Sequence, residues 1–130
     1  NPVQHILFDV KNQGLTNHVV MDEDLTIHRN VMPHLDLISS GTAVESPSEV
    51  VDSHRLSTVF EYIRDEYDVI VVDTPSVLSV TDALVIAEKG DGVLFVVKGH
   101  YVQPDDMALA KQRLDQIGVP IIGSVFIDME

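Results

Sequence analysis

Four short apolar runs rich in β-branched residues constrain the fold of this chain most strongly. They cover Leu35–Ile38, Val69–Val72, Val93–Val97 and Ile121–Phe126. Apolar and polar residues do not alternate strictly in these runs, as they would in a strand with one solvent-exposed face. This pattern is typical of parallel strands that are buried on both faces. Helical patterns lie between the runs, so strand and helix alternate along the chain. The sequence therefore predicts an α/β fold with a mainly parallel sheet flanked by helices.

The clearest helix signal begins at Ser46. Ser46, Pro47 and Glu49 have the spacing of an N-cap, a first helical residue and a capping-box acid. The stretch that follows, in one piece or two, carries apolar residues at steps of three and four, which predicts a helix packed on the sheet. These residues are Leu56, Val59, Phe60, Ile63 and Tyr67.

Three further helices are predicted from similar signals. One opens at Gln103-Pro104 with acids in its first turn and is ended by Gly118. A shorter apolar helix runs from Asp82 to Ala87, and Leu15–Val20 forms another short one.

Composition narrows the classes of function. The length of 130 residues allows one domain of ordinary size. A formal net charge of −13 argues against binding to nucleic-acid phosphates or anionic lipid, because both need a basic surface. The chain has no cysteine, which removes disulfides and thiolate chemistry and fits a reducing compartment. No apolar run approaches the roughly 20 residues of a membrane span. We therefore expect a cytoplasmic segment with no nucleic-acid partner and no direct membrane insertion.

The segment Asp68–Ser76 is the sharpest candidate for chemistry. An apolar run there ends in Asp73 and is followed by the turn-forming residues Thr74-Pro75-Ser76. Ligands of open parallel sheets bind beyond the carboxyl ends of the strands, so Asp73 is placed to hold Mg²⁺ beside a nucleotide, directly or through water. The alternative from this segment alone is that Asp73 only caps the turn. For Asp82 we favour a role in capping the next helix through its side chain, and the alternative is that it lies near the nucleotide.

A phosphate cradle is absent from the sequence. A P-loop needs the pattern G-x-x-x-x-G-K-[ST], because backbone amides and a lysine must wrap the phosphates. The lysines are Lys11, Lys89, Lys98 and Lys111, and none lies in that pattern.

Several spaced segments together carry a resemblance to a known family. They are Asn1–Phe8, Gly14–Thr16, Leu35–Gly41, Ser46–Val51, Tyr67–Pro75, Val80–Ala83 and Ile122–Phe126. In this order they resemble, nearly end to end, the second part of the bacterial tyrosine kinase domain of capsular and exopolysaccharide biosynthesis, which is related to the MinD/ParA ATPases.

The resemblance implies a P-loop NTPase-like fold of the MinD/ParA type that lacks its N-terminal Walker A and Walker A′ strands. Residues 1–130 would then be a single partial kinase-like domain, the Walker B half. Asp73 falls on the Walker B acid, which binds Mg²⁺, and Thr74, Pro75 and Ser76 fall on the family's Thr-Pro-Pro beside the nucleotide. Since the two missing strands are inner strands of the family's sheet, Val69–Val72 would lack neighbours, and each unpaired buried backbone group costs about 1–3 kcal/mol.

The family resemblance also implies an activity and partners. An intact parent would use ATP and Mg²⁺ to autophosphorylate on tyrosine, with roles in exopolysaccharide or capsule synthesis and export. Its partners would be other copies of itself and a membrane chain-length determinant protein, at the inner face of the plasma membrane. Because the P-loop is absent, we expect this segment alone to be inactive and to bind no cofactor.

The sequence departs from the family at several positions. Ser46 and Ser76 differ from the usual residues, and Ile127, followed by Asp128, stands where an asparagine helps to hold the adenine. The tyrosine-rich tail is absent, and the tyrosines present are Tyr62, Tyr67 and Tyr101. We expect Tyr62 and Tyr67 to be helix and core aromatics rather than phosphoacceptors.

Two other interpretations compete with a kinase. The first is a non-catalytic scaffold or oligomerisation module, which the missing Walker elements and Ile127 favour. The second is a receiver-like phosphoacceptor domain that uses Asp9, Asp73 and Lys98. Only 24 residues separate Asp73 from Lys98, which is too few for the additional strand that a receiver needs.

Overall fold

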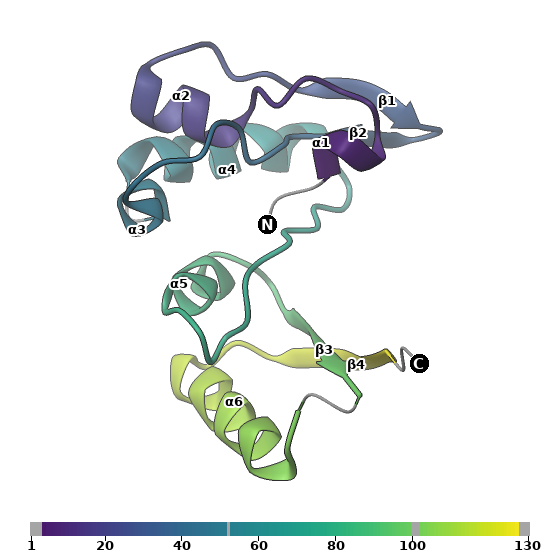
Figure 1. Ribbon diagram of the computed structural model, residues 1–130, viewed down its shortest axis with the longest axis vertical. Helices are drawn as coiled ribbons and strands as arrows, with labels where there is room; N and C mark the ends of the chain where they lie inside the picture. The colour runs from purple at the N-terminus through teal and green to yellow at the C-terminus, as the bar shows by residue number, and fades with distance from the viewer. Residues whose placement is uncertain (1–3, 52, 100–101, 128–130) are drawn as a thin grey trace. The chain divides into compact units, whose positions relative to one another are not determined.

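The computed structural model describes residues 4–51, 53–99 and 102–127. It divides into two compact units, Asn1–Ile70 and Val71–Glu130. The described residues form helices together with one antiparallel and one parallel pair of strands (Figure 1). The assignment of residues 1–130 to one partial domain stays a prediction.

The first unit combines helices with a β-hairpin. Its helices are α1 (Gln4–Leu7), α2 (Leu15–Met21), α3 (Pro47–Val51) and α4 (His54–Glu66), and its strands are β1 (His28–Met32) and β2 (Leu35–Leu37). The predictions of a helix at Leu15–Val20 and of a helical stretch in two pieces after Ser46 are confirmed. The break falls before α4, where the Ser53 hydroxyl accepts a hydrogen bond from the Leu56 amide at 3.1 Å and so caps the new helix.

The core of the first unit lies where the helices meet. Leu56, Val59 and Ile63 of α4 are buried, as their spacing predicted, while Phe60 and Tyr67 are half-buried. α4 and α3 both contact α2. Arg55 of α4 donates a hydrogen bond to the His18 carbonyl at 3.1 Å and pairs with Asp22 at 2.6 Å, which ties α4 to the end of α2.

The run Leu35–Ile38 forms a strand of a different kind from the one predicted. β2 pairs antiparallel with β1, and Pro33 and His34 form the turn between them. His34 and Asn30 both have positive φ, 62° and 53°, and Asn30 lies where the register shifts. A two-residue turn can only reverse the chain, so this strand belongs to a hairpin and not to a parallel sheet.

The second unit contains the parallel strands. β3 (Val93–Lys98) and β4 (Ile121–Ile127) pair in parallel, and α6 (Pro104–Ile117) connects them. The remaining helix is α5 (Asp82–Glu88), which contacts α6. α6 ends at Gly118 with φ of 73°, as its stop signal predicted. Among the described residues of this unit, the buried apolar side chains are those of Ala83, Val97, Ala110 and Leu114.

Burial on both faces was predicted for the strands and is wrong for β3 in this chain. Burial alternates along β3, with Val97 at 5% exposure between more exposed neighbours. Leu94 and Val96 are 55% and 54% exposed. One face of β3 is therefore covered and the other is open.

The predicted strand at Val69–Val72 does not form. The structure assigns neither helix nor strand to residues 68–76. Exposure alternates along the run, at 77%, 36%, 87% and 43%, which is the period of an extended chain. An extended segment becomes a strand only when a neighbour completes its hydrogen-bond ladder, and residues 69–72 pair with no strand of the described chain.

Candidate functional site

The segment that carries Asp73 leads from the extended run into a fixed turn. Asp73 is exposed, Thr74 is half-buried, and Pro75 and Ser76 are exposed. The Ser76 carbonyl accepts hydrogen bonds from the amides of Ser79 at 2.9 Å and Val80 at 3.4 Å. The turn therefore sets the direction in which the chain enters α5.

Further contacts hold this turn. The Ser76 hydroxyl accepts a hydrogen bond from the Leu78 amide at 3.4 Å. Arg113 of α6 donates to the Val77 carbonyl at 3.1 Å. Residues 76–78 are thus attached to the helix that crosses between β3 and β4, and Asp73 lies three residues before this anchored point.

Asp82 lies inside α5 and not at the N-cap position, where we expected it. Asp82 is the first residue of α5, and Thr81 holds the N-cap position without a side-chain cap bond. A carboxylate in the first turn still favours the positive end of the helix dipole. The expectation that the Asp82 side chain caps the helix is therefore wrong, because the helix begins at Asp82 and not after it.

Asp73 provides one carboxylate of the kind that a Mg²⁺ site needs. Mg²⁺ is commonly held by one or two carboxylates together with water and phosphate oxygens, and Asp73 is an exposed carboxylate of the right kind. Within residues 4–51, 53–99 and 102–127, no three His, Cys, Asp or Glu side chains gather into a group that could hold a metal ion by themselves. Asp73 would thus act with ligands from a nucleotide and from water.

The end of β4 does not provide a polar group for a nucleobase. Ile127 is the last residue of β4 and is 40% exposed. Asp128 lies outside the described residues. In the family that the sequence resembles, an asparagine at this position helps to hold the adenine. The aliphatic side chain of Ile127 can form no hydrogen bond with the base.

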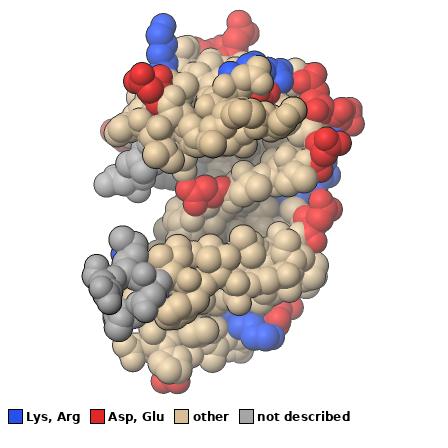
Figure 2. Space-filling model, turned by 90° about the vertical axis from the view of Figure 1, so that its right-hand side faces the viewer, with Lys and Arg blue, Asp and Glu red and all other residues tan. Residues whose placement is uncertain are grey.

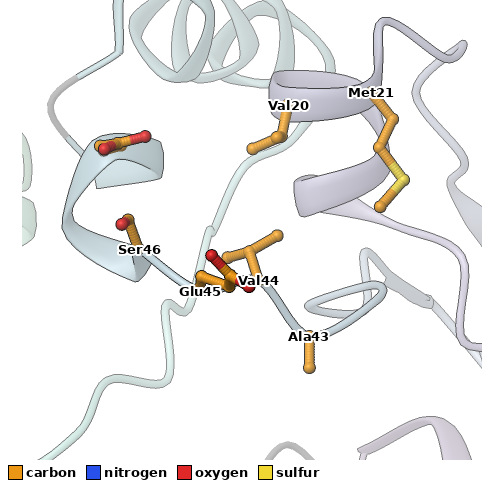
Figure 3. A pocket seen from close by; sticks show the side chains of 7 residues that line it. Val20, Met21, Ala43, Val44, Glu45 and Ser46 are labelled. Atoms are coloured by element: carbon orange, nitrogen blue, oxygen red, sulfur yellow. The ribbon is translucent and has the colours of Figure 1, made fainter.

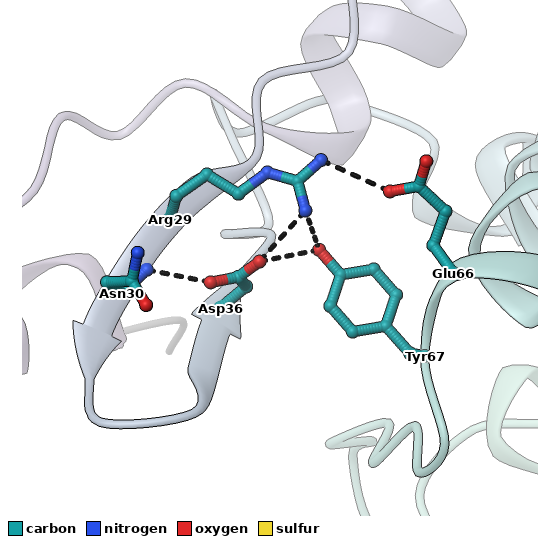
Figure 4. Close-up of polar contacts among 5 residues, drawn as sticks. All are labelled: Arg29, Asn30, Asp36, Glu66 and Tyr67. Carbon is teal, nitrogen blue, oxygen red and sulfur yellow. Dashed lines mark hydrogen bonds and ion pairs between the residues drawn. The ribbon is translucent and has the colours of Figure 1, made fainter.

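A second polar cluster joins the hairpin to the end of α4, and sequence reasoning missed it. Figure 4 shows Arg29 of β1 between the carboxylates of Asp36 and Glu66, at 3.0 and 3.3 Å, with the Tyr67 hydroxyl beside them. The Tyr67 hydroxyl donates to Asp36 at 2.7 Å and accepts from Arg29 at 2.5 Å. The guanidinium carbon lies 5.8 Å from the centre of the Tyr67 ring. The cluster holds the chain where it leaves α4.

The charges of this cluster shift one another's pKa values. The Asn30 amide donates to Asp36 at 2.7 Å, and this bond, with those from Tyr67 and Arg29, lowers the pKa of the Asp36 carboxyl. The hydrogen bond to Asp36 raises the pKa of the Tyr67 hydroxyl. Bonds to Asp36 and Glu66 raise the pKa of Arg29, which stays charged.

Of the two tyrosines expected as helix and core aromatics, Tyr62 lies on a helix as predicted, whereas Tyr67 is not a buried core residue. Tyr62 lies on α4 but is 48% exposed, and Tyr67 is the half-buried residue that ends the helix. Neither belongs to the buried core, and Tyr101 lies outside the described residues. No spacing rule could have found the partners of Tyr67, because Arg29 and Tyr67 are 38 positions apart.

Acidic side chains outnumber basic ones in this chain. The chain carries 21 Asp and Glu against 8 Lys and Arg, and Figure 2 shows acidic side chains on both units. None of the helices among the described residues is long and apolar enough to cross a membrane.

Comparison with curated proteins finds bacterial tyrosine kinases. The putative tyrosine-protein kinase CapB of Staphylococcus aureus is 30% identical over 131 residues, which cover 98% of this chain and 58% of CapB. The tyrosine-protein kinase etk of Escherichia coli K12 is 32% identical over 127 residues, which cover 93% of this chain and 17% of etk. The chain therefore spans only part of the length of these relatives. No family model matches it.

Solved structures give the same result for the fold. The kinase domain of the Escherichia coli tyrosine kinase ETK matches with a TM-score of 0.89 and 31% identity, over 99% of this chain and 52% of that one. The chimerical protein CapA2B2 matches with a TM-score of 0.88 and 25% identity, over 98% of this chain and 57% of that one. The predicted fold class, α/β of the P-loop NTPase-like kinase domains, is confirmed. These matches favour the kinase-like interpretation over the receiver-like one.

Proposed function

We propose that this chain, a homologue of bacterial tyrosine-protein kinases over part of their kinase domain, supplies the acidic side of a MgATP site in such a kinase. The observation that carries the proposal is the position of Asp73. It is an exposed carboxylate at the end of an apolar run, three residues before a turn anchored to α6. If neighbouring strands pair with residues 69–72, Asp73 would follow the carboxyl end of a strand, where ligands of open parallel sheets bind.

In the proposed site Asp73 holds Mg²⁺, and Thr74, Pro75 and Ser76 line the nucleotide. Mg²⁺ held there would supply positive charge to offset the negative charge that develops on the phosphate in the transition state. The chain's own contribution is to place one carboxylate and to keep the turn after it rigid. A tyrosine hydroxyl oxygen would form a bond to the γ-phosphorus while the bond from that phosphorus to the bridging oxygen of ADP breaks. ADP would leave with the electron pair of that bond, and the hydroxyl proton would pass to water.

The rest of the site would come from residues outside this sequence. None of the four lysines lies in a glycine-rich phosphate loop, so the amides and the lysine that wrap the phosphates are not supplied here. The unpaired run at residues 69–72 supports this view, because its backbone groups are open to neighbouring strands. By itself, the chain would neither bind MgATP tightly nor transfer phosphate.

The biological setting follows from the same homology. We propose a role in capsule or exopolysaccharide synthesis and export, at the inner face of the plasma membrane. The partners would be further copies of the chain and a membrane chain-length determinant protein. The name CapB and the relatives named EpsB, from Ralstonia, support the setting.

A second candidate is a kinase-like scaffold without catalysis. The apolar Ile127 at the end of β4 favours it, because the side chain offers no hydrogen bond to a base. A scaffold would require the fold and its surfaces but not the Asp73 carboxylate.

A hybrid kinase domain separates the two candidates. This chain would replace the matching half of the Escherichia coli ETK kinase domain, and phosphotyrosine formation from MgATP would be measured. If Asp73 holds Mg²⁺, the hybrid is active and Asp73→Ala lowers its rate at least about 100-fold. Asp91→Ala, at another exposed aspartate, is the matched control and should leave the rate unchanged.

The remaining outcomes decide against the proposal. A folded hybrid with no activity would favour the scaffold, and an active hybrid that tolerates Asp73→Ala would remove Asp73 from the site. Thermal melting of the chain alone with MgATP completes the test, because a ligand that binds only the folded state raises the melting temperature. We expect no shift, and an upward shift abolished by Asp73→Ala would show that the chain holds a complete site.

A further inference from the structure

An open pocket of about 460 Å³ lies in the first unit, away from the Asp73 segment along the sequence. Its lining comes from the end of α2, the loop that follows Gly41, and α3 (Figure 3). The lining residues are Val20, Met21, Ala43, Val44, Glu45, Ser46 and Glu49. Its volume falls within the range of about 300–1,000 Å³ that is typical of ligand pockets.

The pocket has an apolar wall and an acidic wall. Val20 and Met21, at the end of α2, are 53% and 46% exposed. Glu45 and Glu49 are exposed carboxylates on the other segments of the lining. Within the part of the chain that the structure describes, neither carboxylate has an ion-pair or hydrogen-bond partner.

The loop that forms the pocket is fixed before any partner arrives. The Thr42 amide donates to the Asn17 carboxamide oxygen at 3.1 Å, and the Asn17 amide group donates to the Thr42 hydroxyl at 3.3 Å. Thr16 donates to the Thr42 carbonyl at 2.7 Å. Asn17 is only 6% exposed, so these bonds are shielded from water. A rigid loop spares a binding partner part of the entropy cost of ordering it.

Among the residues that the structure describes, no basic side chain forms an ion pair with Glu45 or Glu49. Arg55 is the cation attached to the end of α2, and it is engaged by Asp22 and by the His18 carbonyl. A ligand that fits must therefore bring both a positive charge and an aliphatic surface. Small polyamines offer the charge without apolar branches, whereas a peptide with arginine beside leucine offers both.

We propose that this pocket docks a basic, partly aliphatic peptide segment of a partner protein. An arginine or lysine of that segment would lie between Glu45 and Glu49, and a neighbouring aliphatic side chain would contact Val20, Met21 and Val44. This surface is independent of the proposed kinase function, because it uses no residue assigned to the nucleotide site.

The probe for the test is an acetylated and amidated 12-residue peptide made only of leucine, alanine and arginine. Its binding to the chain would be measured by fluorescence anisotropy at physiological salt, and the contact site by amide chemical-shift perturbation. We expect perturbations at residues 20–21 and 43–49. The double variant Glu45→Gln with Glu49→Gln should weaken binding about tenfold.

Matched controls separate the pocket from general attraction to an acidic protein. Glu61→Gln with Glu88→Gln changes the net charge equally at two exposed sites and should leave the affinity unchanged. Val20→Ser should weaken binding about threefold, whereas Ile6→Ser, at a residue 69% exposed elsewhere, should not. Circular dichroism checks that each variant is folded.

Three results would overturn the proposal. The control glutamates could weaken binding as much as Glu45 and Glu49 do, or the perturbations could map outside the pocket. Spermidine could displace the peptide completely and perturb the same amides, which would make the pocket a general cation site. A peptide with glutamate in place of arginine should not bind.

Discussion

Two runs of almost the same composition, Val69–Val72 and Val93–Val97, have opposite fates in this molecule. Val93–Val97 becomes a strand because β4 completes its hydrogen bonds. The Val93 amide donates to the Pro120 carbonyl at 2.9 Å, and just after the run the Gly99 amide donates to the Ile127 carbonyl at 2.8 Å. Val69–Val72 has no such neighbour among the described strands and stays extended and exposed. Strand propensity therefore favours an extended chain, but a partner is needed to make it a strand.

The largest expected difference between the runs is in their tolerance of charge. Val97 is 5% exposed, so Val97→Asp should lower the free energy of unfolding by about 3 kcal/mol or more, because a carboxylate would be buried without a partner. Val71 is 87% exposed, and Val71→Asp should change the free energy of unfolding by less than about 0.5 kcal/mol. Urea denaturation measures both. Equal losses would mean that residue 71 is buried in solution.

Amide hydrogen exchange should sharpen the same contrast. The β3 amides that donate to β4 should exchange at least about 100-fold more slowly than those of Val69 and Val71, because exchange in a paired strand requires local opening. In the active hybrid kinase domain, protection should also appear at residues 69–72. Protection of those residues in the chain alone would reveal a partner strand and contradict the comparison.

The cluster at the start of the first run should have a smaller effect. Tyr67→Phe removes the hydroxyl that bonds Asp36 and Arg29 and should destabilise the chain by about 0.5–1 kcal/mol. Tyr62→Phe is the matched control, since Tyr62 lies exposed on the same helix. If both variants melt alike, the cluster does not anchor the run.

The smallest of these effects should be the change with pH in the destabilisation that Tyr67→Phe causes. The pKa of Asp36 is lowered on folding, so its contribution is present above the ordinary carboxyl pKa of about 4 and is lost as the pH falls through the lowered value. The pKa of Tyr67 is raised, so its contribution is present below about pH 10 and is lost as the pH rises through the raised value. Urea midpoints of Tyr67→Phe and the parent should therefore converge at both extremes. A constant gap would exclude this coupling.

Local patterns predicted several elements correctly. The helices that begin near Leu15, Pro47, Asp82 and Pro104 are confirmed, and so is the stop at Gly118. These elements depend on caps, glycine and periodicity within a few residues, and such signals are read directly from the sequence. The hairpin was missed, because His34 adopts positive φ in the two-residue turn and a histidine does not indicate this in the way that glycine does.

Part of the candidate site could also be predicted from the sequence. Asp73 and the turn residues after it were predicted as nucleotide-site residues from the sequence, and their role stays a prediction. The structure shows Asp73, Pro75 and Ser76 as exposed and Thr74 as half-buried. The anchor from Arg113 to Val77 and the cluster around Tyr67 could not be predicted, because their members are 36 and 38 positions apart. The pocket beside Glu45 and Glu49 was missed for the same reason, since it needs α2 to meet the loop after Gly41.

The sequence by itself determined where helices start and stop, the acidic surface, and the absence of a phosphate-binding loop, because each depends on residue types and short spacings. Tertiary structure decided which apolar run became a strand, which carboxylates received partners, and where the surface was hollowed. These outcomes depend on which segments meet in space, since a backbone amide or a carboxylate is stabilised by the group that faces it and not by its neighbours along the chain.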